Sequence, residues 1–438
     1  MAYKYDLFNG VTKVKTKLAI AFSTLGIGAA GFAGSMAILG SAHAAVGGPA
    51  CNVPGDYATI QAAVSDPGCS TVNVAAGSYA ENINIAHTLV LNGPQAGNAV
   101  SGRAFGGVGE ATISGVDKTA SIPVINIGAS GVVVDGFSIT NSVTSGASQG
   151  VAVSGSGDNA VIKNNLFDTI TTAGVDGQAT AQAVYLYNGP DGVQVLNNSV
   201  NNISSNRSAK GVLLGDNGAA NGPTNTTIQG NSFTGITSTT RGAYGISMGN
   251  TTQPISGLQI LNNTFSGLNG TGWVHVIGVE GNAPGIVVSG NSITGITSPT
   301  ADKIAVWFEN EDTSFATAKV NNNNFNVPAP IFGVAVHPSL TGGSLDGTCN
   351  WWNSVTGPTV ASNPGGTGAA TTVGVTYSPW LTTQNGSCNS GHPQTKQDCM
   401  NGGWQTLTDS SFTSFKNQGD CVSYVATGGK NTASTKTH

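Results

Sequence analysis

Residues 228–236 read IQGNSFTGI, and nearly the same phrase returns as ILNNTFSGL at 260–268 and as VSGNSITGI at 288–296. Three further segments carry the pattern: VIKNNLFDTI (161–170), VLNNSVNNI (195–203) and VNNNNFNV (320–327). One asparagine recurs at intervals of 33, 33, 32, 28 and 32 residues, at Asn165, Asn198, Asn231, Asn263, Asn291 and Asn323. A period in this range is typical of one supersecondary unit stacked many times.

The composition of each period decides which unit is repeated. Short β-branched runs broken by Gly and Asn are strand-and-turn chemistry, whereas a helical repeat would place apolar residues at i, i+3 and i+4. A propeller blade needs about 40–45 residues. About 30 residues suit one coil of a parallel β-solenoid, in which equivalent residues of successive coils lie about 4.8 Å apart. We therefore expect an all-β, parallel β-helical fold.

In such a fold the repeated asparagines become a structural ladder. Stacked Asn side chains can bond to the coils above and below, and Asn tolerates the left-handed backbone of a tight corner. The apolar residue two positions later should point inward. These inward residues are Phe167, Val200, Phe233, Phe265, Ile293 and Phe325.

The ends of the chain differ from the coils. Residues 58–66, ATIQAAVSD, have helical spacing and predict an N-terminal cap. The coil pattern fades after Asn353, so we expect a β-helix over 45–381, a polar linker over 382–398 and a small module over 399–438.

Residues 1–44 predict a secretory signal peptide: four lysines, then an apolar stretch at 18–40, then Ala42-His43-Ala44 as a small-x-small cleavage site. A membrane anchor is the alternative, because the apolar run is long enough to span a bilayer. Without residues 1–44 the chain has 12 basic and 20 acidic residues, a net charge of −8. An acidic exported chain without a basic run argues against nucleic acid and anionic lipid as partners.

Six cysteines in an exported protein suggest disulfides, and six allow 15 pairings. The three local pairs are favoured because each would fasten an end of the molecule: Cys51 with Cys69, Cys349 with Cys388, and Cys399 with Cys421. The last bridge would close the C-terminal module around Trp404, Phe412 and Phe415. The sequence has no Cys-x-x-Cys and no histidine at ligand spacing, so we expect no zinc, no other metal and no cofactor.

Several motifs resemble a known superfamily. The opening DYATIQAAVSD (56–66), followed by VNVAAGSYAENINI (72–85), resembles the start of pectin lyase-like proteins. CNWWNSVTGPT (349–359) with YSPWL (377–381) is similar to a closing segment of secreted bacterial proteins of this type. The resemblance implies a right-handed parallel β-helix over roughly 50–381. It does not imply one activity, because this scaffold carries many functions.

The motifs that identify the enzymes of this superfamily are absent from the sequence. GSYAEN (77–82) is similar to a pectin methylesterase stretch, but the segments that carry the esterase aspartates and arginine are missing. The clustered acids of pectate lyases and the Asp-Asp and Gly-His-Gly motifs of polygalacturonases are missing too. Tyr79 and Glu81 are therefore better explained as parts of the first coil.

The remaining candidate is an outer face, found by aligning the strand that precedes each Asn corner. We align Gly-Val or Ala-Val pairs, including Gly245-Ile246, Gly278-Val279 and Ala305-Val306, so that the next residue points outward. The aligned face gathers polar and aromatic residues at Tyr185, Tyr187, Glu280, Trp307, Glu309 and His337, with Asp216, Glu311 and Asp312 at its edge. In this alignment Glu280 and Glu309 lie one coil and two residues apart, roughly 8 Å.

Three functional interpretations follow from this face. Aromatic rings beside carboxylates suit sugar binding, which favours a secreted or cell-surface, glycan-binding, adhesin-like structural protein with a polysaccharide or cell-surface glycan as partner. The alternative is a polysaccharide-degrading enzyme, an inverting glycoside hydrolase or a lyase, with Glu280 and Glu309 as catalytic acids. A rigid spacer that presents residues 399–438, with an ordinary solvated face, is the third. The oligomeric state does not follow from the sequence.

Overall fold

The computed structural model describes residues 49–433 except 120, 176, 178, 216–219, 250, 300–301, 387, 389–392, 394, 401, 406 and 410–412. The predicted signal peptide at 1–44 lies outside the described residues, as do Asp216 and Phe412. Within the described ranges, no helix is both long and apolar enough to cross a membrane.

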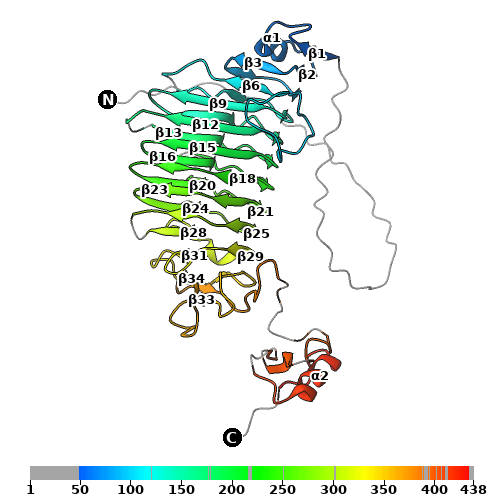
Figure 1. Ribbon diagram of the computed structural model, residues 1–438, viewed down its shortest axis with the longest axis vertical. Coiled ribbons are helices and arrows are strands. Elements are labelled where there is room, and N and C mark those ends of the chain that lie inside the picture. The colour runs from blue at the N-terminus through cyan, green and yellow to red at the C-terminus, as the bar shows by residue number, and fades with distance from the viewer. Residues whose placement is uncertain are drawn as a thin grey trace, which may run out of the picture. The chain divides into compact units, whose positions relative to one another are not determined.

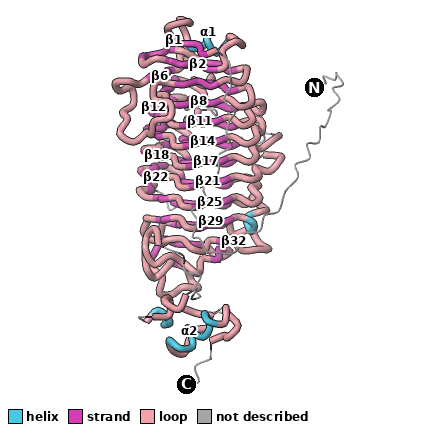
Figure 2. The backbone as a smooth tube through the Cα atoms, turned by 90° about the vertical axis from the view of Figure 1, so that its right-hand side faces the viewer, coloured by secondary structure: helices cyan, strands magenta, loops and turns pink. Residues whose placement is uncertain are grey.

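Three long sheets run along a stack of coils, and each coil contributes a strand to each sheet in turn (Figures 1 and 2). All pairings between named strands of the described chain are parallel; the two antiparallel bridges found, Val360–Asn363 and Thr408–Ser414, lie outside these strands. The predicted parallel β-helix is therefore confirmed, while its right-handed winding stays a prediction.

Sheet A has 12 strands, in the order β1 (Ala50–Val53), β2 (Thr71–Val74), β5 (Val90–Asn92), β8 (Val133–Asp135), β11 (Val161–Lys163), β14 (Gln194–Leu196), β17 (Thr227–Gln229), β21 (Gln259–Leu261), β25 (Val287–Ser289), β29 (Lys319–Asn321), β32 (Leu345–Asp346) and β35 (Val375–Thr376). Sheet B has 12 strands: β3 (Gly77–Ala80), β6 (Ala111–Ser114), β9 (Ser138–Val143), β12 (Leu166–Thr172), β15 (Ser199–Ser205), β18 (Ser232–Thr234), β19 (Thr237–Ser238), β22 (Thr264–Ser266), β23 (Leu268–Gly270), β26 (Ser292–Ile293), β27 (Ile296–Thr297) and β30 (Asn324–Phe325). Sheet C has 11 strands: β4 (Ile83–Ile85), β7 (Ile125–Ile127), β10 (Ser148–Val153), β13 (Thr180–Leu186), β16 (Ser208–Leu214), β20 (Gly242–Met248), β24 (Trp273–Val279), β28 (Lys303–Phe308), β31 (Phe332–Val336), β34 (Gly368–Thr371) and β33 (Pro358–Thr359).

The repeated asparagines form a continuous ladder at the corner between sheets A and B. The side-chain oxygen of Asn231 accepts from the backbone N–H and the side-chain amide of Asn198, at 2.8 and 3.0 Å. Asn231 repeats both bonds toward Asn263, and its amide also donates to the Val195 carbonyl. The same contacts run from Asn165 to Asn323 and continue to Asn350, which the sequence alignment did not include.

The left-handed backbone of this corner falls on the residue before each ladder asparagine, and not on the ladder asparagine itself. That preceding residue is Asn or Gly in all six repeats: Asn164, Asn197, Gly230, Asn262, Gly290 and Asn322, with φ between 53° and 70°. A second left-handed residue follows four positions after the ladder, as at Gly235 and Gly267. The G-N-S-F-T-G phrase therefore encodes two tight corners with a short inward-facing strand between them.

The apolar residue two positions after each ladder asparagine points into the core, as expected. Phe167, Val200, Phe233, Phe265, Ile293 and Phe325 are all buried and stand in register on successive strands of sheet B. The Phe233 and Phe265 rings stack with centroids 4.8 Å apart and planes 5° apart.

Glycines on sheet C make room for these rings. A methyl group at Gly245 would lie 2.5 Å from the Phe265 ring, and Gly211 faces Phe233 in the same way. In the next coil Ile293 takes the position of Phe265, and Val276 takes the position of Gly245. The size of one residue therefore compensates for the size of its neighbour across the core.

The two ends of the β-helix carry the bridges that the local pairing predicted. Cys51 is bonded to Cys69 beside the first coil, and Cys349 to Cys388 beside the last, with Cα separations of 5.7 and 5.1 Å. Helix α1 (Ile60–Ser65) packs on the first strands through Ile60, Ala63 and Val64. Its first backbone N–H groups donate to the Glu81 carboxylate, which gives Glu81 a structural role. That this helix acts as an end cap stays a prediction.

A separate small core lies in the C-terminal part of the chain. The Cys399–Cys421 bridge packs with Leu407, Phe415 and Tyr424, and Trp404 is partly buried against it. Helix α2 (Gln418–Ala426) carries Cys421, and a short 3-10 turn, η2 (Gly403–Gln405), carries Trp404. Another 3-10 turn, η1 (Phe315–Thr317), belongs to the β-helix. The domain boundaries at 381 and 398 stay predictions.

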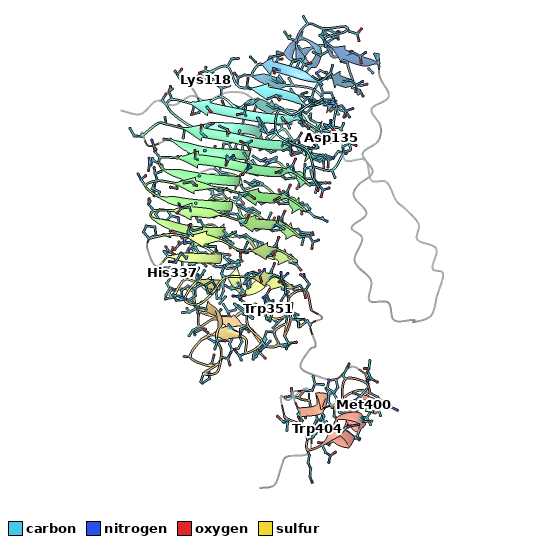
Figure 3. All side chains as sticks on the ribbon, in the orientation of Figure 1. Lys118, Asp135, His337, Trp351, Met400 and Trp404 are labelled. Carbon is cyan, nitrogen blue, oxygen red and sulfur yellow. A yellow bond between two sulfur atoms is a disulfide. The ribbon has the colours of Figure 1, made fainter. Side chains whose placement is uncertain are left out.

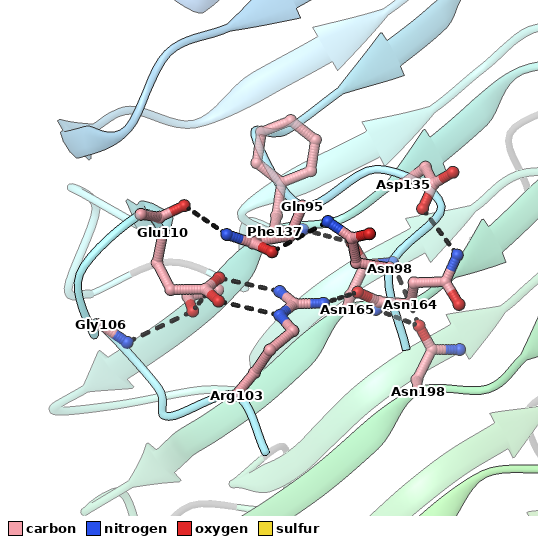
Figure 4. A network of polar contacts seen from close by, with 12 residues as sticks. Gln95, Asn98, Arg103, Gly106, Glu110, Asp135, Phe137, Asn164, Asn165 and Asn198 are labelled. Atoms are coloured by element: carbon pink, nitrogen blue, oxygen red, sulfur yellow. Dashed lines mark hydrogen bonds and ion pairs between the residues drawn. The ribbon is translucent and has the colours of Figure 1, made fainter. Parts of the chain in front are cut away.

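A long loop after β5 is fastened to the outside of the corner by a buried ion pair (Figure 4). Both Arg103–Glu110 contacts measure 2.8 Å, and Arg103 also donates to the Asn164 carbonyl at 2.6 Å. Ser138 donates to the same glutamate at 3.0 Å. The ion pair thus ties the loop to the corner residue beside the ladder, and we assign it a structural role.

The size compensation across the core makes a stability prediction. Gly245→Ala should lower the free energy of unfolding by about 1–3 kcal/mol, because the new methyl group meets the Phe265 ring. Adding Phe265→Ile, which copies the Val276–Ile293 coil, should recover part of that loss. Urea unfolding followed by circular dichroism measures both. A double variant no more stable than Gly245→Ala would contradict the compensation.

Candidate functional site

The outer face of sheet C is built from strands stacked one above the next, seen in Figure 1 from β13 to β31. Because side chains alternate along a strand, residues in register form outward columns. One column is Ala152, Tyr185, Leu213, Ser247, Gly278, Trp307 and Ala335. The next residue position on the same face, two residues further along, carries Tyr187, Glu280, Glu309 and His337.

The register at β24 corrects the sequence alignment. Ile277, and not Val279, pairs with Ile246 and Val306, so Gly278 stands beside Trp307. The alignment matched Gly278-Val279 to the Gly-Val pairs of other coils. In those coils the glycine makes room for a core phenylalanine, but this coil has Ile293 in place of the phenylalanine and needs no glycine there. A shift of two residues keeps Glu280 on the outer face.

Glu280 and Glu309 consequently occupy the same position on adjacent coils. Val279 pairs with Phe308, and the Glu309 N–H donates to the Val279 carbonyl at 2.9 Å. Their backbones are therefore one strand spacing apart, about 4.8 Å. The expected separation of roughly 8 Å was wrong, and with it the ground for an inverting hydrolase.

Both glutamates line a groove of about 720 Å³ that crosses five successive coils. The groove combines three carboxylates, two cations, two large aromatic rings and several hydroxyl groups. Its lining residues are Thr180, Ser208, Lys210, Arg241, Tyr244, Thr251, Thr252, Trp273, Glu280, Glu309, Asn310 and Glu311. Glu280, Glu309 and Glu311 were expected on this face, whereas the cations and the two rings were not.

Two aromatic side chains lie on glycines and join in a chain of hydrogen bonds. A methyl group at Gly242 would collide with the Trp273 indole, and one at Gly278 would lie 3.0 Å from the Tyr244 ring. Trp273 Nε1 donates to the Tyr244 hydroxyl, which donates to Glu280 Oε1; both distances are 2.6 Å. Burial, followed by the charge of Glu280, raises the pKa of Tyr244 well above its usual value.

The two cations lie over the same two rings. Lys210 Nζ is 5.4 Å from the centre of the Tyr244 ring, and the Arg241 guanidinium is 5.5 Å from that of Trp273. These are cation–π distances. Both cations and all three carboxylates line the same groove, so the groove offers hydrogen-bond donors as well as hydrogen-bond acceptors.

Two rings lie beside Glu309: Trp307 on the same coil and His337, labelled in Figure 3, on the next coil. Trp307 Nε1 donates to Glu309 Oε2 at 2.8 Å, and His337 Nε2 is 4.0 Å from Glu309 Oε1. The indole and imidazole rings meet edge to face at 5.9 Å. The structure thus brings three of the predicted residues together.

The predicted tyrosines belong to a different part of the face. Tyr185 and Tyr187 stack on each other at 5.2 Å, and the Tyr187 hydroxyl donates to Asn126 at 3.2 Å. Tyr185 is four coils from Trp307 in the same column, which corresponds to about 19 Å. Neither tyrosine lines the groove.

Asp312 is not a surface residue at the edge of the face. Its side chain is fully buried, and Oδ1 accepts from the Ser314 N–H and hydroxyl at 2.9 and 2.6 Å. Oδ2 has no hydrogen-bond partner among the described residues. Burial raises the pKa of this carboxyl, although the bonds from Ser314 act in the opposite direction. Asp312 therefore shapes the loop that carries Glu309 and Glu311.

The residues missed from the sequence occupy an outward column just before the aligned Gly-Val pairs. Lys210, Tyr244 and His275 form this column, and Trp273 stands two residues earlier on β24. Strict alternation back from the outward Leu213 and Ser247 would turn Lys210 and Tyr244 inward. They point outward because Gly211 and Val212, like Gly245 and Ile246, both face the core, a break in the alternation that the sequence does not signal. Among the described residues, no group of acidic, histidine or cysteine side chains is arranged to hold a metal ion.

The buried carboxyl of Asp312 gives a pH-dependent prediction. A raised pKa means that the folded protein holds a proton that the unfolded chain releases, so this contribution to stability grows as pH falls through the raised value. Asp312→Asn should therefore be more stable than the native protein at neutral pH, with the difference shrinking toward about pH 4. Thermal unfolding across pH measures this. The half-buried Asp346, bonded to Thr348 at 2.7 Å, is the control, and an equal gain in Asp346→Asn would contradict the assignment.

The sequence matches no protein-family model, and no curated protein matches it. Among solved structures, the chain is similar to tailspike protein gp49 from Acinetobacter baumannii bacteriophage Fri1, a capsular polysaccharide depolymerase, with a TM-score of 0.34 and 9% sequence identity. The match covers 71% of this chain and 56% of the tailspike, so the chain spans little more than half of that protein. A similarity this low says nothing about the activity of this chain. Its fold as a parallel β-helix rests on the strand register itself.

Proposed function

We propose that the groove binds a polysaccharide chain, and that the protein acts as a glycan-binding, adhesin-like protein at or outside the cell surface. The observation that carries this proposal is the combination of the partly exposed Trp273 ring with the carboxylates of Glu280 and Glu309 in one open groove. Aromatic faces suit the C–H face of a sugar ring, and carboxylates accept hydrogen bonds from its hydroxyls.

The shape of the groove supports an extended ligand. Its lining residues come from strands β13 to β28 or from the loops that follow them, which is four strand spacings, about 19 Å. Thr251 and Thr252 of one loop and Ser208 at the start of β16 add hydroxyl groups along the groove. A linear glycan would meet different coils along its length.

The three disulfides support a location outside the reducing cytoplasm. Cys349 and Cys388 join the last coil to the residues that follow it, and Asn324 bonds to Asn385 at 2.6 Å across the same junction. This arrangement suits a protein exposed to an oxidising environment. The signal-like leader at 1–44 points the same way.

Trp273→Ala tests the binding proposal against a matched control on the same face. The native protein should be retained by at least one member of a panel of cellulose, xylan, chitin, dextran and polygalacturonate, and Trp273→Ala should lose that retention by about tenfold or more. Tyr185→Ala removes an aromatic ring outside the groove and should bind normally. Retention by none of the five, or an equal loss in both variants, would contradict the groove as a glycan site.

The in-register carboxylates favour a second candidate function, glycoside hydrolysis. One carboxylic acid would protonate the glycosidic oxygen while the other carboxylate attacks the anomeric carbon or activates water. The two backbones are one strand spacing apart, about 4.8 Å, so the two residues stand side by side in the groove, as a pair of carboxyl groups acting on one glycosidic bond requires. This candidate requires the same groove to hold the scissile bond.

Reducing-end release from the same panel separates hydrolysis from binding. If the protein is a hydrolase, Glu280→Gln and Glu309→Gln should each lower release by about 10²–10⁴-fold while retention persists. Glu311→Gln is the control, since Glu311 lies outside the in-register pair. Retention without any release by the native protein would eliminate the enzyme and leave the binding protein.

A further inference from the structure

We propose that Tyr244 is a positioning residue of this site, which acts on the glycan through Glu280 by fixing that carboxylate as a hydrogen-bond acceptor. This inference rests on the proposed binding function. It names a residue that contributes to recognition without being a main contact surface itself.

The phenol of Tyr244 is held from both sides. Trp273 Nε1 can only donate, so the Tyr244 oxygen accepts from it at 2.6 Å. The hydroxyl hydrogen is then directed to Glu280 Oε1, also at 2.6 Å. Trp273 is the first residue of β24, Glu280 directly follows the last one, and Tyr244 comes from the neighbouring β20. One side chain thus connects the ring platform to the carboxylate.

The ring of Tyr244 has little freedom to leave this position. It packs over Gly278, where any Cβ would lie 3.0 Å from two ring atoms, and His275 meets it edge to face at 5.8 Å. Lys210 covers the ring at 5.4 Å. A residue held in this way can fix the direction of Glu280 before a ligand arrives, which reduces the entropy lost on binding.

Burial separates the role of Tyr244 from that of Trp273. Tyr244 is only 3% exposed, whereas Trp273 is partly exposed and can offer its ring to a sugar. With a pKa raised by burial, the Tyr244 phenol stays protonated and remains a donor. Its main effect on a ligand must therefore pass through the group to which it donates.

A double-mutant cycle tests the coupling in the full chain. Tyr244→Phe keeps the ring and removes the hydroxyl, and it should weaken binding to the retained polysaccharide of the panel by about tenfold. In the Glu280→Gln background the same change should cost less than about twofold, because the carboxylate is already gone. Equal losses in both backgrounds would overturn the proposal. Tyr187→Phe, which removes a hydroxyl bonded to Asn126 outside the groove, is the matched control.

A second measurement needs no glycan and keeps the inference separate from the proposed function. Labelling of carboxylates with a water-soluble carbodiimide and an amine, read by mass spectrometry, should rise severalfold at Glu280 in Tyr244→Phe. Glu311 should be unchanged, and Tyr187→Phe should alter neither site. Unchanged labelling of Glu280 would overturn the positioning role. Failure of the panel to retain the native protein would instead contradict the proposed function.

Discussion

The asparagine ladder is the constraint on which the rest of the molecule depends. Each rung is a buried amide that accepts from the coil before it and donates to the coil after it, as Asn231 does between Asn198 and Asn263. An amide displaced from this position would leave buried donors and acceptors without partners, which costs more than one ordinary hydrogen bond contributes. The ladder therefore fixes the register of the coils from Asn165 to Asn350 at one corner, and loops of different length can enter elsewhere without disturbing it.

This constraint explains why the fold could be predicted. The corner phrase repeats because a backbone turn, a buried amide and an inward ring must recur together, so the period, the ladder and the Phe233–Phe265 stack all follow from one alignment. The alignment did not include Asn350 because the sequence at its corner is CNWWN, in which Cys349 and not Asn or Gly takes the left-handed conformation. The same left-handed turn before the ladder asparagine is therefore formed there by a different residue type.

The strand alignment was wrong at β24, where a glycine has a different structural role from the glycines of the neighbouring coils. Glycine on sheet C marks the place where a phenylalanine needs room, and in the coil with Ile293 that place is taken by Val276. Aligning Gly278 with the other glycines moved Glu280 by two residues and gave it the wrong distance to Glu309. Gly278 in fact makes room on the outside, for the Tyr244 ring. A single sequence does not show which side of a sheet a glycine serves.

The groove depends on the core through this same register. Its carboxylates, rings and cations come from four successive coils, those of β16, β20, β24 and β28. Tyr244 reaches Glu280, 36 residues further along the chain, only because β20 and β24 pair as they do. Individual residues of the site, such as Glu280 and Glu309, could be found by strand alternation, whereas the hydrogen-bond chain from Trp273 to Glu280 could not. These hydrogen bonds require the Trp273 side chain to pass over Gly242 of the preceding coil and the Tyr244 side chain to pass over Gly278 of the following coil. The groove is thus a property of the stacking, and a change that shifts one coil would separate the carboxylates from the rings without altering any residue that lines it.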